Sequence, residues 1–567
     1  MDEKPWFKSY DAGVPHTLQP YPEQTLLDVL AETVRQRPEH TALIFKGRRM
    51  SYAELDRLSS AFGAALLAQG VEKGERVAVL VPNSPQAIIA QLGAWKAGAI
   101  VAPLNALYTE RELEYSLNEI RAETVVVLTP FYAKVKAVQP RTPVRRVIVT
   151  NIKEHLSPAL KLFFTLLKEK REGHRIEIEP GDLWLADLLR RHGGASRPGA
   201  AAAPAPQDPA ILLFSGGTTG TPKAALGTHK ALLTSAQQLQ AYARTVLVDW
   251  EDTLTLVMPL FHVYGNMAMN CALLARWPMA IIANPRDIDD LVSTIRKVGP
   301  ACLHGVPTLF IALLDHPDVK SGKAGIDSMK ICWSAAAPLM AETKQRFEAV
   351  TGGWLLEAYA MTETMLAAAC CPVHGTYKEG SVGVPLPDVD MRVVDVDTGE
   401  QELPPGEVGE IIVSAPQIMV GYWERPTETE NMIREWAGQR WVYTGDLGYI
   451  DEDGYLFIVD RKKDLIKPSG FQVWPREVEE VIATHPAVAE VSVAGVPDAQ
   501  QGEAVKAWIV LQPGQEVSRD EIRAYCRERL TGYKVPRHVE FRDGLPKTMV
   551  GKVLRRVLKE EEAAKKA

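Results

Sequence analysis

The sequence predicts an α/β protein built from more than one domain. Its 567 residues exceed what one hydrophobic core usually organises. Short apolar runs, such as Arg76–Val81 and Thr124–Leu128, alternate with stretches of helical periodicity, and that alternation is typical of layered α/β folds. A smaller α/β pattern follows from about residue 463. We therefore expect a large domain over residues 1–462 and a small one over residues 463–567.

Three segments of the large domain have clear local signals. Residues 51–69 predict an amphipathic helix, with Ser51 and Glu54 matching a capping box. Residues 194–209 are rich in Ala, Pro and Gly and predict an exposed linker. Residues 448–456 predict a hairpin with the turn Asp-Glu-Asp-Gly. The apolar stripe of the first helix consists of Leu55, Leu58, Phe62, Ala65 and Leu66.

Residues 156–171 predict a basic amphipathic helix. One face carries Leu160, Phe163, Phe164 and Leu167, and the opposite face carries Lys161, Thr165 and Lys168. Basic amphipathic helices lie on membrane surfaces, but helices packed on a protein core have the same apolar stripe. Two interpretations stay open: peripheral membrane contact through this segment, or an ordinary helix packed on the core.

Composition restricts the partners and the compartment. The net charge is −7, from 64 basic and 71 acidic residues, so we expect no nucleic-acid partner. The six cysteines form no C-x-x-C pair, which favours a reducing compartment. The N-terminus lacks an apolar signal core, and no apolar stretch is long enough to span a bilayer. We expect a cytoplasmic protein, with the inner face of the membrane as a peripheral location.

A glycine-rich segment follows directly on the apolar run Ile211–Phe214. It reads Ser215-Gly216-Gly217-Thr218-Thr219-Gly220-Thr221-Pro222-Lys223. Such a segment leaves backbone N–H groups and small hydroxyls free to surround phosphate oxygens, with a cation at the rim. It is not a Walker loop, because Thr221 and Pro222 separate Gly220 from the lysine. The alternative interpretation is a flexible surface turn.

Six further segments follow this loop in the order of a known family. They are Pro259–His262, Ala336–Leu339, Tyr359–Thr364 (YAMTET), Trp441–Gly448 (WVYTGDLG), Asp460–Pro475 (DRKKDLIKPSGFQVWP) and Pro546–Lys552 (PKTMVGK). Together they resemble the adenylate-forming superfamily of acyl-CoA synthetases, amino-acid adenylation domains and luciferases. The resemblance covers roughly residues 25–558. The Gly-Gly-Thr-Thr-Gly form of the loop and the basic insert are similar to bacterial long-chain fatty-acyl-CoA synthetases.

The resemblance implies a fold and a reaction. The fold is a large N-terminal domain of layered α/β subdomains plus a small mobile α+β C-terminal domain. The reaction joins a long-chain fatty acid to ATP as an acyl adenylate, releasing pyrophosphate, and then transfers the acyl group to coenzyme A with release of AMP. The implied partners are therefore a small-molecule carboxylic acid, ATP with Mg²⁺, and coenzyme A. A homodimer is left open.

The resemblance also implies roles for particular residues. In the first step an anion attacks an anionic phosphate, so repulsion must be screened and developing charge stabilised. Glu363 and Ser215 would hold Mg²⁺, Lys552 would bridge carboxylate and α-phosphate, and Lys463 would be the hinge between the domains. The implied catalytic residues are Lys552, Glu363, Thr218 and His262. Asp446 and Arg461 would contact the ribose, and Gly470 would line the pantetheine tunnel. The full set of implied nucleotide and coenzyme A contacts is Ser215, Gly216, Gly217, Thr219, Gly220, Lys223, Glu357, Ala358, Tyr359, Thr362, Asp446, Arg461, Lys463, Lys467 and Gly470.

The acid itself is less well defined. Between the histidine and Thr-Glu segments no aspartate is placed to hold a substrate amine, and the candidates there are apolar or small, which favours an acyl chain without fixing its length. These candidates are Met267, Met269, Leu303, Gly305, Val306 and Ala367. A coenzyme A ligase for medium-chain or aryl acids, a luciferase-like oxidase and a non-catalytic lipid-binding relative are the alternatives.

Alanines stand where the family usually has glycine. They are Ala224, Ala335 or Ala336, and Ala360. If any of these positions requires a positive φ, alanine strains it by about 1–2 kcal/mol, which would weaken the nucleotide site.

Overall fold

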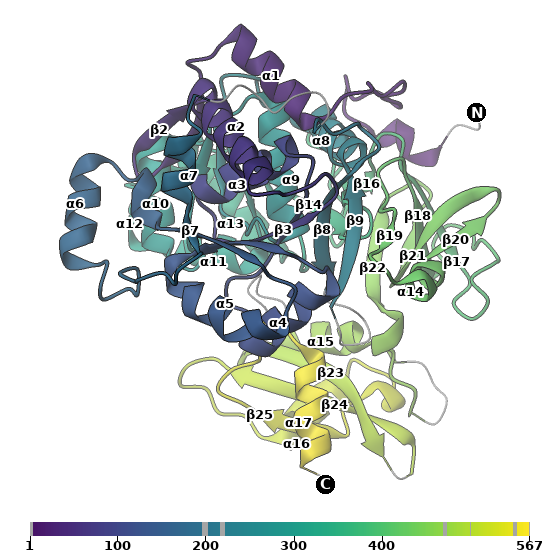
Figure 1. Ribbon diagram of the computed structural model, residues 1–567. Coiled ribbons are helices and arrows are strands. Elements are labelled where there is room, and N and C mark those ends of the chain that lie inside the picture. The colour runs from purple at the N-terminus through teal and green to yellow at the C-terminus, as the bar shows by residue number, and fades with distance from the viewer. Residues whose placement is uncertain are drawn as a thin grey trace.

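The structure is a computed structural model that describes residues 4–194, 202–215, 222–468, 473–498, 500–547 and 553–565. It contains a large α/β domain that runs through strand β22 and a smaller domain that ends at the C-terminus (Figure 1). The predicted two-domain α/β architecture is confirmed. The exact boundary between residues 462 and 463 stays a prediction. Most of the predicted linker, residues 195–201, lies outside the described residues.

The first sheet of the large domain has eight strands in the order β19-β9-β8-β4-β3-β5-β6-β7. The strands from β8 through β7 pair in parallel, whereas β8–β9 and β9–β19 pair antiparallel. Their bounds are β3 Arg76–Leu80, β4 Ile100–Pro103, β5 Thr124–Leu128, β6 Arg146–Thr150, β7 Leu183–Trp184, β8 Pro209–Ser215, β9 Lys223–Thr228 and β19 Gly421–Tyr422.

The second sheet has nine strands in the order β16-β15-β14-β13-β12-β10-β11-β1-β2. Its central strands, from β14 to β1, are parallel, and antiparallel pairs close both edges. The bounds are β1 Thr41–Phe45, β2 Arg48–Ser51, β10 Leu254–Leu256, β11 Met279–Ile281, β12 Cys302–Gly305, β13 Ile331–Ser334, β14 Trp354–Met361, β15 Leu366–Cys370 and β16 Val384–Pro385.

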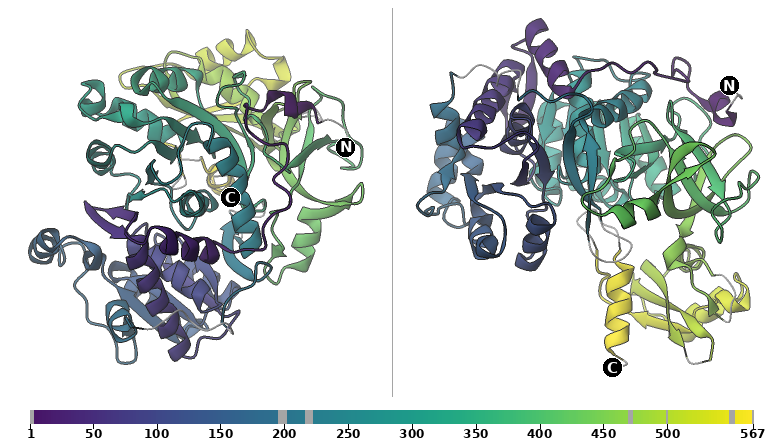
Figure 2. Two further views of the ribbon diagram at one scale, coloured as in Figure 1. Left: turned by 90° about the horizontal axis from the view of Figure 1, so that it is seen from above. Right: turned by 45° about the vertical axis from the view of Figure 1, so that its right-hand side comes forward.

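Helices cover both sheets (Figure 2). A large apolar core is shared by both sheets, and a second apolar cluster packs α4 and α5 against the eight-stranded sheet. Helices α3 and α9 are buried along their whole length, as expected for helices between two layers. The helices of the large domain are α1 Leu26–Gln36, α2 Tyr52–Ala68, α3 Pro85–Lys96, α4 Glu110–Glu119, α5 Tyr132–Val138, α6 Pro158–Leu167, α7 Leu185–Arg191, α8 His229–Ala243, α9 Val263–Ala275, α10 Ile288–Val298, α11 Pro307–Asp315, α12 Pro317–Lys320, α13 Ala341–Thr351 and α14 Pro426–Met432.

Helix α2 matches the helix predicted over residues 51–69. The Ser51 hydroxyl caps it by accepting a hydrogen bond from Glu54 N, and its whole predicted stripe is buried. The reciprocal half of the predicted capping box is replaced, because the Glu54 carboxylate pairs with Arg48 instead. The cap therefore satisfies one N–H at the helix start, and the core holds the rest of the helix.

An antiparallel sheet completes the large domain. Strands β17, β18, β21 and β20 lie in that order, and β22 pairs with the end of β21. The predicted hairpin over residues 448–456 is confirmed by this last pair. The bounds are β17 Asp390–Val394, β18 Gly409–Ser414, β20 Ile433–Trp436, β21 Gln439–Ile450 and β22 Leu456–Arg461.

The small domain has its own sheet and core. Strand β24 pairs antiparallel with β23 and parallel with β25. Helices pack on this sheet around two apolar clusters that are separate from the core of the large domain. Helix α17 runs from the side that faces the large domain down to the C-terminus (Figure 1). The bounds are α15 Pro475–Ala483, β23 Val488–Asp498, β24 Gly502–Leu511, α16 Arg519–Arg527, β25 His538–Phe541 and α17 Arg555–Ala564.

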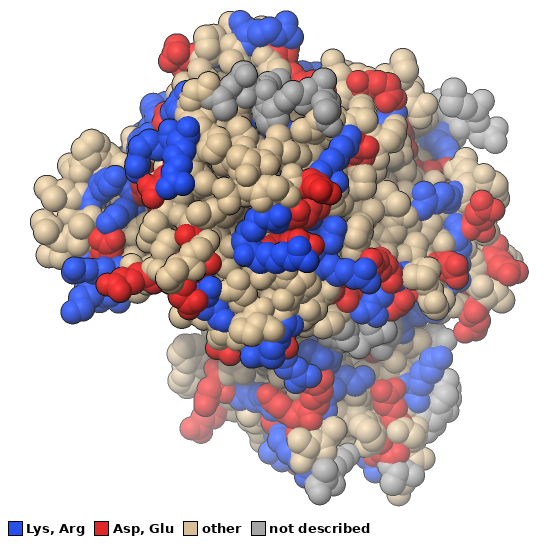
Figure 3. Space-filling model, in the orientation of Figure 1, with Lys and Arg blue, Asp and Glu red and all other residues tan. Residues whose placement is uncertain are grey.

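Helix α6 confirms a helix within residues 156–171 but does not pack as an ordinary core helix. Of its apolar side chains only Phe164 is buried, with its ring against His174. The surface over α6 is largely uncharged, with basic side chains beside it (Figure 3). The side chains left exposed are Leu160, Leu162, Phe163, Leu166 and Leu167, between 41% and 72% accessible. Among the described residues, no helix has the length and hydropathy to cross a bilayer.

Candidate functional site

The glycine-rich segment lies between two paired strands. Ser215 ends β8, Lys223 begins β9, and the two residues are partners in the antiparallel register. The Tyr115 hydroxyl donates a hydrogen bond of 2.9 Å to Pro222 O and ties the second strand to α4. The predicted phosphate contacts Gly216, Gly217, Thr218, Thr219 and Gly220 lie outside the described residues. The structure therefore fixes the base of this loop.

Tyr422 connects both ends of this loop to Glu363. Its hydroxyl donates a hydrogen bond of 2.6 Å to Glu363 Oε1, and Lys223 Nζ lies 5.2 Å from the centre of its ring. Ser215 lies near the same hydroxyl, but its buried Oγ has no hydrogen-bond partner of standard geometry among the described residues. Burial and the Glu363 carboxylate raise the pKa of Tyr422 well above its usual range, so the phenol stays a neutral donor.

Glu363 is buried and is presented by a strained turn after β14. Met365 has φ +50° and Leu366 has φ +120°, values that residues other than glycine rarely adopt. The Thr364 hydroxyl holds the turn by donating to Leu366 O at 2.8 Å. Met419 N donates to the backbone oxygen of Glu363 at 2.9 Å. Such strain persists only where surrounding contacts enforce it, and it often marks a functional site. Thr362, also a predicted contact, begins this turn and is half-buried.

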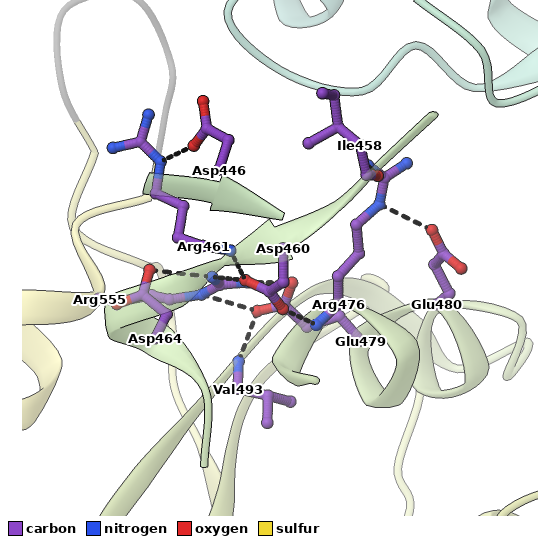
Figure 4. Close-up of polar contacts among 10 residues, drawn as sticks. All are labelled: Asp446, Ile458, Asp460, Arg461, Asp464, Arg476, Glu479, Glu480, Val493 and Arg555. Carbon is purple, nitrogen blue, oxygen red and sulfur yellow. Dashed lines mark hydrogen bonds and ion pairs between the residues drawn. The ribbon is translucent and has the colours of Figure 1, made fainter. Parts of the chain in front are cut away.

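Three predicted nucleotide contacts meet in one cluster. The Tyr359 hydroxyl donates to Asp446 Oδ2 at 2.6 Å. Arg461 Nε lies 2.9 Å from Asp446 Oδ1, a contact that Figure 4 shows. Asp446 is buried and sits in a bulge of β21 that Gly445 makes possible by adopting φ +68°. The Thr444 hydroxyl accepts a hydrogen bond from Asp446 N at 3.0 Å. Pairing of β21 with β22 therefore positions Asp446 and Arg461, and the hydrogen bond from Tyr359 joins them to β14 of the nine-stranded sheet.

Glu357 and Ala358 precede Tyr359 on β14. Glu357 is 5% exposed, and burial raises the pKa of its carboxyl to about 7. Its Oε1 accepts a hydrogen bond of 3.2 Å from Leu339 N, in the loop before α13. Ala358 is half-buried. This strand therefore links the Tyr359 cluster to the Ala335–Leu339 loop.

The alanine departures divide into two kinds. Ala224 and Ala360 lie inside strands β9 and β14, where alanine is unstrained. Ala335 also has no positive φ, but Ala336 adopts φ +69°. The conditional strain expected from these alanines therefore falls on Ala336 alone among these four residues.

The remaining predicted residues that the structure describes lie at the start of α9 and in the segment after β22. His262 caps α9, and its Nδ1 accepts a hydrogen bond of 3.2 Å from Tyr264 N. Lys463 lies in the single 3₁₀ turn Lys462–Asp464 that follows β22. Lys467 has an exposed side chain, and its backbone N donates to Glu503 at 2.8 Å. Gly470 and Lys552 lie outside the described residues.

Sequence reasoning missed Tyr422 and the residues that surround the hinge segment. Tyr422 belongs to the two-residue edge strand β19, paired with Ala225 of β9, and no residue pattern marks it. Asp460 begins one predicted motif and Arg555 follows another, but neither was given a role, and their contact joins positions 95 residues apart. Only the tertiary structure places these side chains at the site.

Fold and site together define a two-domain α/β enzyme whose polar cluster lies where the large domain leads into the small one. The model of the AMP-binding enzyme family matches residues 30–423, and that of the AMP-binding enzyme C-terminal domain matches residues 477–552. The chain belongs to the AMP-binding enzyme family.

Relatives match the chain over nearly its full length. It is 37% identical over 563 residues to the long-chain-fatty-acid–CoA ligase of Bacillus subtilis, covering 99% of both chains. The structure of ATP-bound MatB from Rhodopseudomonas palustris matches with a TM-score of 0.81 at 31% identity, covering 95% of this chain and 99% of that one. The apo structure of the same MatB matches with the same identity and coverage but a TM-score of 0.71.

Proposed function

We propose that this protein is a long-chain fatty acid–CoA ligase that forms AMP. It converts a fatty acid and ATP into an acyl adenylate and pyrophosphate, and then converts the adenylate and coenzyme A into acyl-CoA and AMP. The observation that carries the proposal is the site itself: buried Glu363 beside the loop base, and the Tyr359–Asp446–Arg461 cluster next to it. Whole-length identity to a ligase of this class supports the choice of acid.

The residues suit the charge problem of the first step. A carboxylate must approach a phosphate that is already anionic, so cations and hydrogen-bond donors must be in place beforehand. Asp446 and Arg461 suit the ribose hydroxyls, the loop with Lys223 suits the outer phosphates, and Lys552 suits the bridge between carboxylate and α-phosphate. These assignments rest on motif order and on the positions of the described residues.

Mg²⁺ enters this reaction with ATP as part of the substrate. It takes oxygen ligands and usually keeps substrate phosphates and waters in its shell. The buried Glu363 carboxylate and the Ser215 hydroxyl, which lacks a partner of standard geometry among the described residues, offer such oxygens. A bound Mg²⁺ would neutralise phosphate charge, while Tyr422 keeps the Glu363 side chain oriented.

The small domain serves both steps by changing its orientation about Lys463, with the domain boundary between residues 462 and 463. Lys552 and Gly470 have different tasks at one site, so one must leave before the other arrives. The orientation seen here belongs to the first step. The higher TM-score to ATP-bound than to apo MatB supports that assignment.

The acid can be tested directly. Pyrophosphate release is measured for a panel of carboxylic acids from short to long chain and for aryl acids, with and without coenzyme A. We expect the highest kcat/KM for long-chain acids and AMP as the nucleotide product. A preference for medium-chain or aryl acids would correct the substrate, oxygen uptake would favour the luciferase-like alternative, and ADP with phosphate as products would contradict the proposal.

A second proposal concerns helix α6 (residues 158–167), which we assign to weak, reversible contact with the cytoplasmic face of a membrane. Five of its apolar side chains are 41% to 72% exposed, and Lys161 and Lys168 lie on the same short segment. Apolar insertion combined with attraction to anionic lipid is how such helices bind. An acid that partitions into lipid would then be collected near its source.

Liposome flotation separates this role from a plain surface helix. Phe163→Glu is compared with wild type and with Val248→Glu, a matched change at an exposed apolar residue outside α6. We expect wild type and Val248→Glu to float with anionic vesicles and to float less with neutral ones. Phe163→Glu should remain in the bottom fraction with unbound protein. Equal flotation of all three proteins would contradict the assignment.

A further inference from the structure

Arg555 begins helix α17, three residues after Lys552, and its guanidinium contacts three carboxylates (Figure 4). Nη2 lies 2.6 Å from Glu479 Oε2 and Nε lies 3.2 Å from Glu479 Oε1, which makes a two-point contact. Nη1 lies 3.2 Å from Asp460 Oδ1 and 3.3 Å from Asp464 Oδ2. Two-point contacts of this kind fix the plane of an arginine as well as its charge.

The three carboxylates are divided by the proposed hinge at Lys463: Asp460 precedes it, whereas Asp464 and Glu479 follow it. Asp460 is on β22 of the large domain, before Lys463. Glu479 is on α15 of the small domain and also accepts a hydrogen bond of 2.7 Å from Val493 N. The Arg555–Glu479 contact is therefore internal to the small domain, whereas the Arg555–Asp460 contact crosses the hinge.

Asp460 makes a second contact across the hinge. Its side chain is 2% exposed, and Oδ2 accepts a hydrogen bond of 2.8 Å from Arg476 N at the start of α15. The Arg476 guanidinium in turn donates to Ile458 O on β22 at 2.6 Å. Side chains alternate along a strand, and Arg461, the next residue, turns to Asp446 instead. One strand thus connects the polar cluster on one face to the small domain on the other.

A rotation about Lys463 would affect these contacts differently. Everything after the hinge moves together, so Arg555–Glu479 would survive. Asp460 would lose both Arg476 N and Arg555, and its buried charge would have to be rehydrated or paired again. Removing one partner of a buried ion pair is costly because it leaves the other charge uncompensated. These contacts therefore favour the present orientation over a rotated one.

We propose that Asp460 and Arg555 form a latch that holds the small domain in the orientation of the first half-reaction. Arg555 is a positioning residue: it ties the start of α17 to Asp460 of the large domain and takes no part in the chemistry. The latch rests on the proposed function, specifically on the hinge at Lys463 and on the two-step reaction.

The test measures the two half-reactions separately in the full-length protein. Acyl adenylate formation is followed in a single turnover without coenzyme A, and acyl transfer is followed from pre-made adenylate with coenzyme A. Asp460→Asn removes the cross-hinge charge, and Glu479→Gln, the matched control, removes a carboxylate from the same arginine within the small domain. We expect Asp460→Asn to slow the first step about tenfold and to leave the second within twofold of wild type.

The control and a conservative series sharpen the result. Glu479→Gln is expected to change both steps by similar factors, because it loosens the small domain without a preference for either orientation. Arg555→Lys keeps the charge and is expected to retain more of the first step than Arg555→Ala. An equal change in both steps for Asp460→Asn, or no change in either, would overturn the latch. Absence of adenylate formation in wild type would instead overturn the proposed function.

Hydrogen exchange in the wild-type protein gives an answer even if Asp460→Asn fails to fold. The amide of Arg476 is hydrogen-bonded to Asp460 in the present orientation. We expect it to be protected with ATP bound and to exchange at least tenfold faster with coenzyme A and a non-reactive acyl-adenylate analogue. Unchanged protection, in a sample where the analogue is shown to bind, would overturn the latch.

Discussion

The two sides of the proposed hinge at Lys463 are built by different kinds of contact. On the large-domain side, Asp446 and Arg461 lie on the paired strands β21 and β22, and Tyr359 lies on β14 of the nine-stranded sheet, so the backbone position of each is set by a strand ladder. On the small-domain side, Arg555 reaches the large domain through a side-chain ion pair with Asp460. A strand ladder fixes a residue permanently, whereas an ion pair can be exchanged for water or for another partner.

Under the proposed two-step reaction, this difference would let one site serve both half-reactions. Side chains needed in both steps, such as those that bind the nucleotide, belong on the large-domain side, where strand pairing keeps them in place. Groups needed in one step belong on the side held by reversible contacts. Substitutions on the small-domain side should then separate the half-reactions, and those on the large-domain side should change stability or both steps together.

We expect the largest effect from removing Lys552, the residue of the small-domain side that is proposed to act in the first step. Lys552→Ala should lower adenylate formation by about 10²–10³-fold, because it removes a preorganised charge where two anions meet. Acyl transfer from pre-made adenylate should stay near the wild-type rate. The control is Lys547→Ala, which removes a lysine paired with Glu490 at 2.6 Å in the same segment. Equal loss in both half-reactions would contradict the division between the two sides.

Locking the hinge should have the opposite selectivity to breaking the latch. Lys463 lies in a 3₁₀ turn, whose φ of about −60° matches the value that proline imposes. Lys463→Pro should therefore keep the present orientation, leave adenylate formation largely intact and slow acyl transfer by about tenfold or more. Lys463→Ala removes the side chain without fixing φ and serves as the control. A proline variant that makes thioester at the wild-type rate would place the pivot elsewhere.

On the fixed side, Glu357 should make stability depend on pH. Burial raises the pKa of its carboxyl from 4.5 to about 7, so the folded state binds more protons than the unfolded state between these values. Stability should fall as pH rises through this window and stay low above it. Glu357→Gln should be more stable than wild type at pH 8, on the order of 1–3 kcal/mol, and equal to it near pH 4.

The measurement is thermal unfolding of both proteins across pH. Gln keeps an oxygen for Leu339 N, so the comparison isolates the charge. Glu379→Gln, at an exposed glutamate, is the control and should follow wild type at every pH. If the Glu357→Gln difference were the same at pH 4 and pH 8, titration of this carboxyl would not be its cause.

The sequence predicted what depends on local patterns. The fold class, helix α2 with its Ser51 cap and the hairpin at residues 448–456 follow from periodicity and turn chemistry, and all are present. Helix α6 was also predicted as a helix, but the sequence did not predict how little of its apolar face is buried. Periodicity shows that a helix has an apolar face and says nothing about what covers it.

Contiguous motifs identified the three residues of the Tyr359 cluster, and their roles at the site stay predictions. Tyr359, Asp446 and Arg461 come from three separate motifs and meet within hydrogen-bond distance. Tyr422 could not be found in this way, because its role depends on β19 pairing with β9. The contact of Arg555 with Asp460 likewise needs the small domain to dock, which no local pattern encodes.

The smallest expected effect compares two alanines on the fixed side. Ala336 has φ +69° and is exposed, so glycine there relieves strain without opening a cavity. The relief of about 1–2 kcal/mol exceeds the 0.4–1 kcal/mol that glycine costs through unfolded-state entropy. Ala360 lies within β14, where glycine brings only that cost. Ala336→Gly should therefore stabilise the large domain by roughly 0.5–1 kcal/mol, and Ala360→Gly should destabilise it by a similar amount, as measured by urea unfolding. If the free energy of unfolding changed with the same sign for both substitutions, the backbone of Ala336 would carry no strain. Alanine in place of the family's usual glycine would then have no influence on the conformation of that loop.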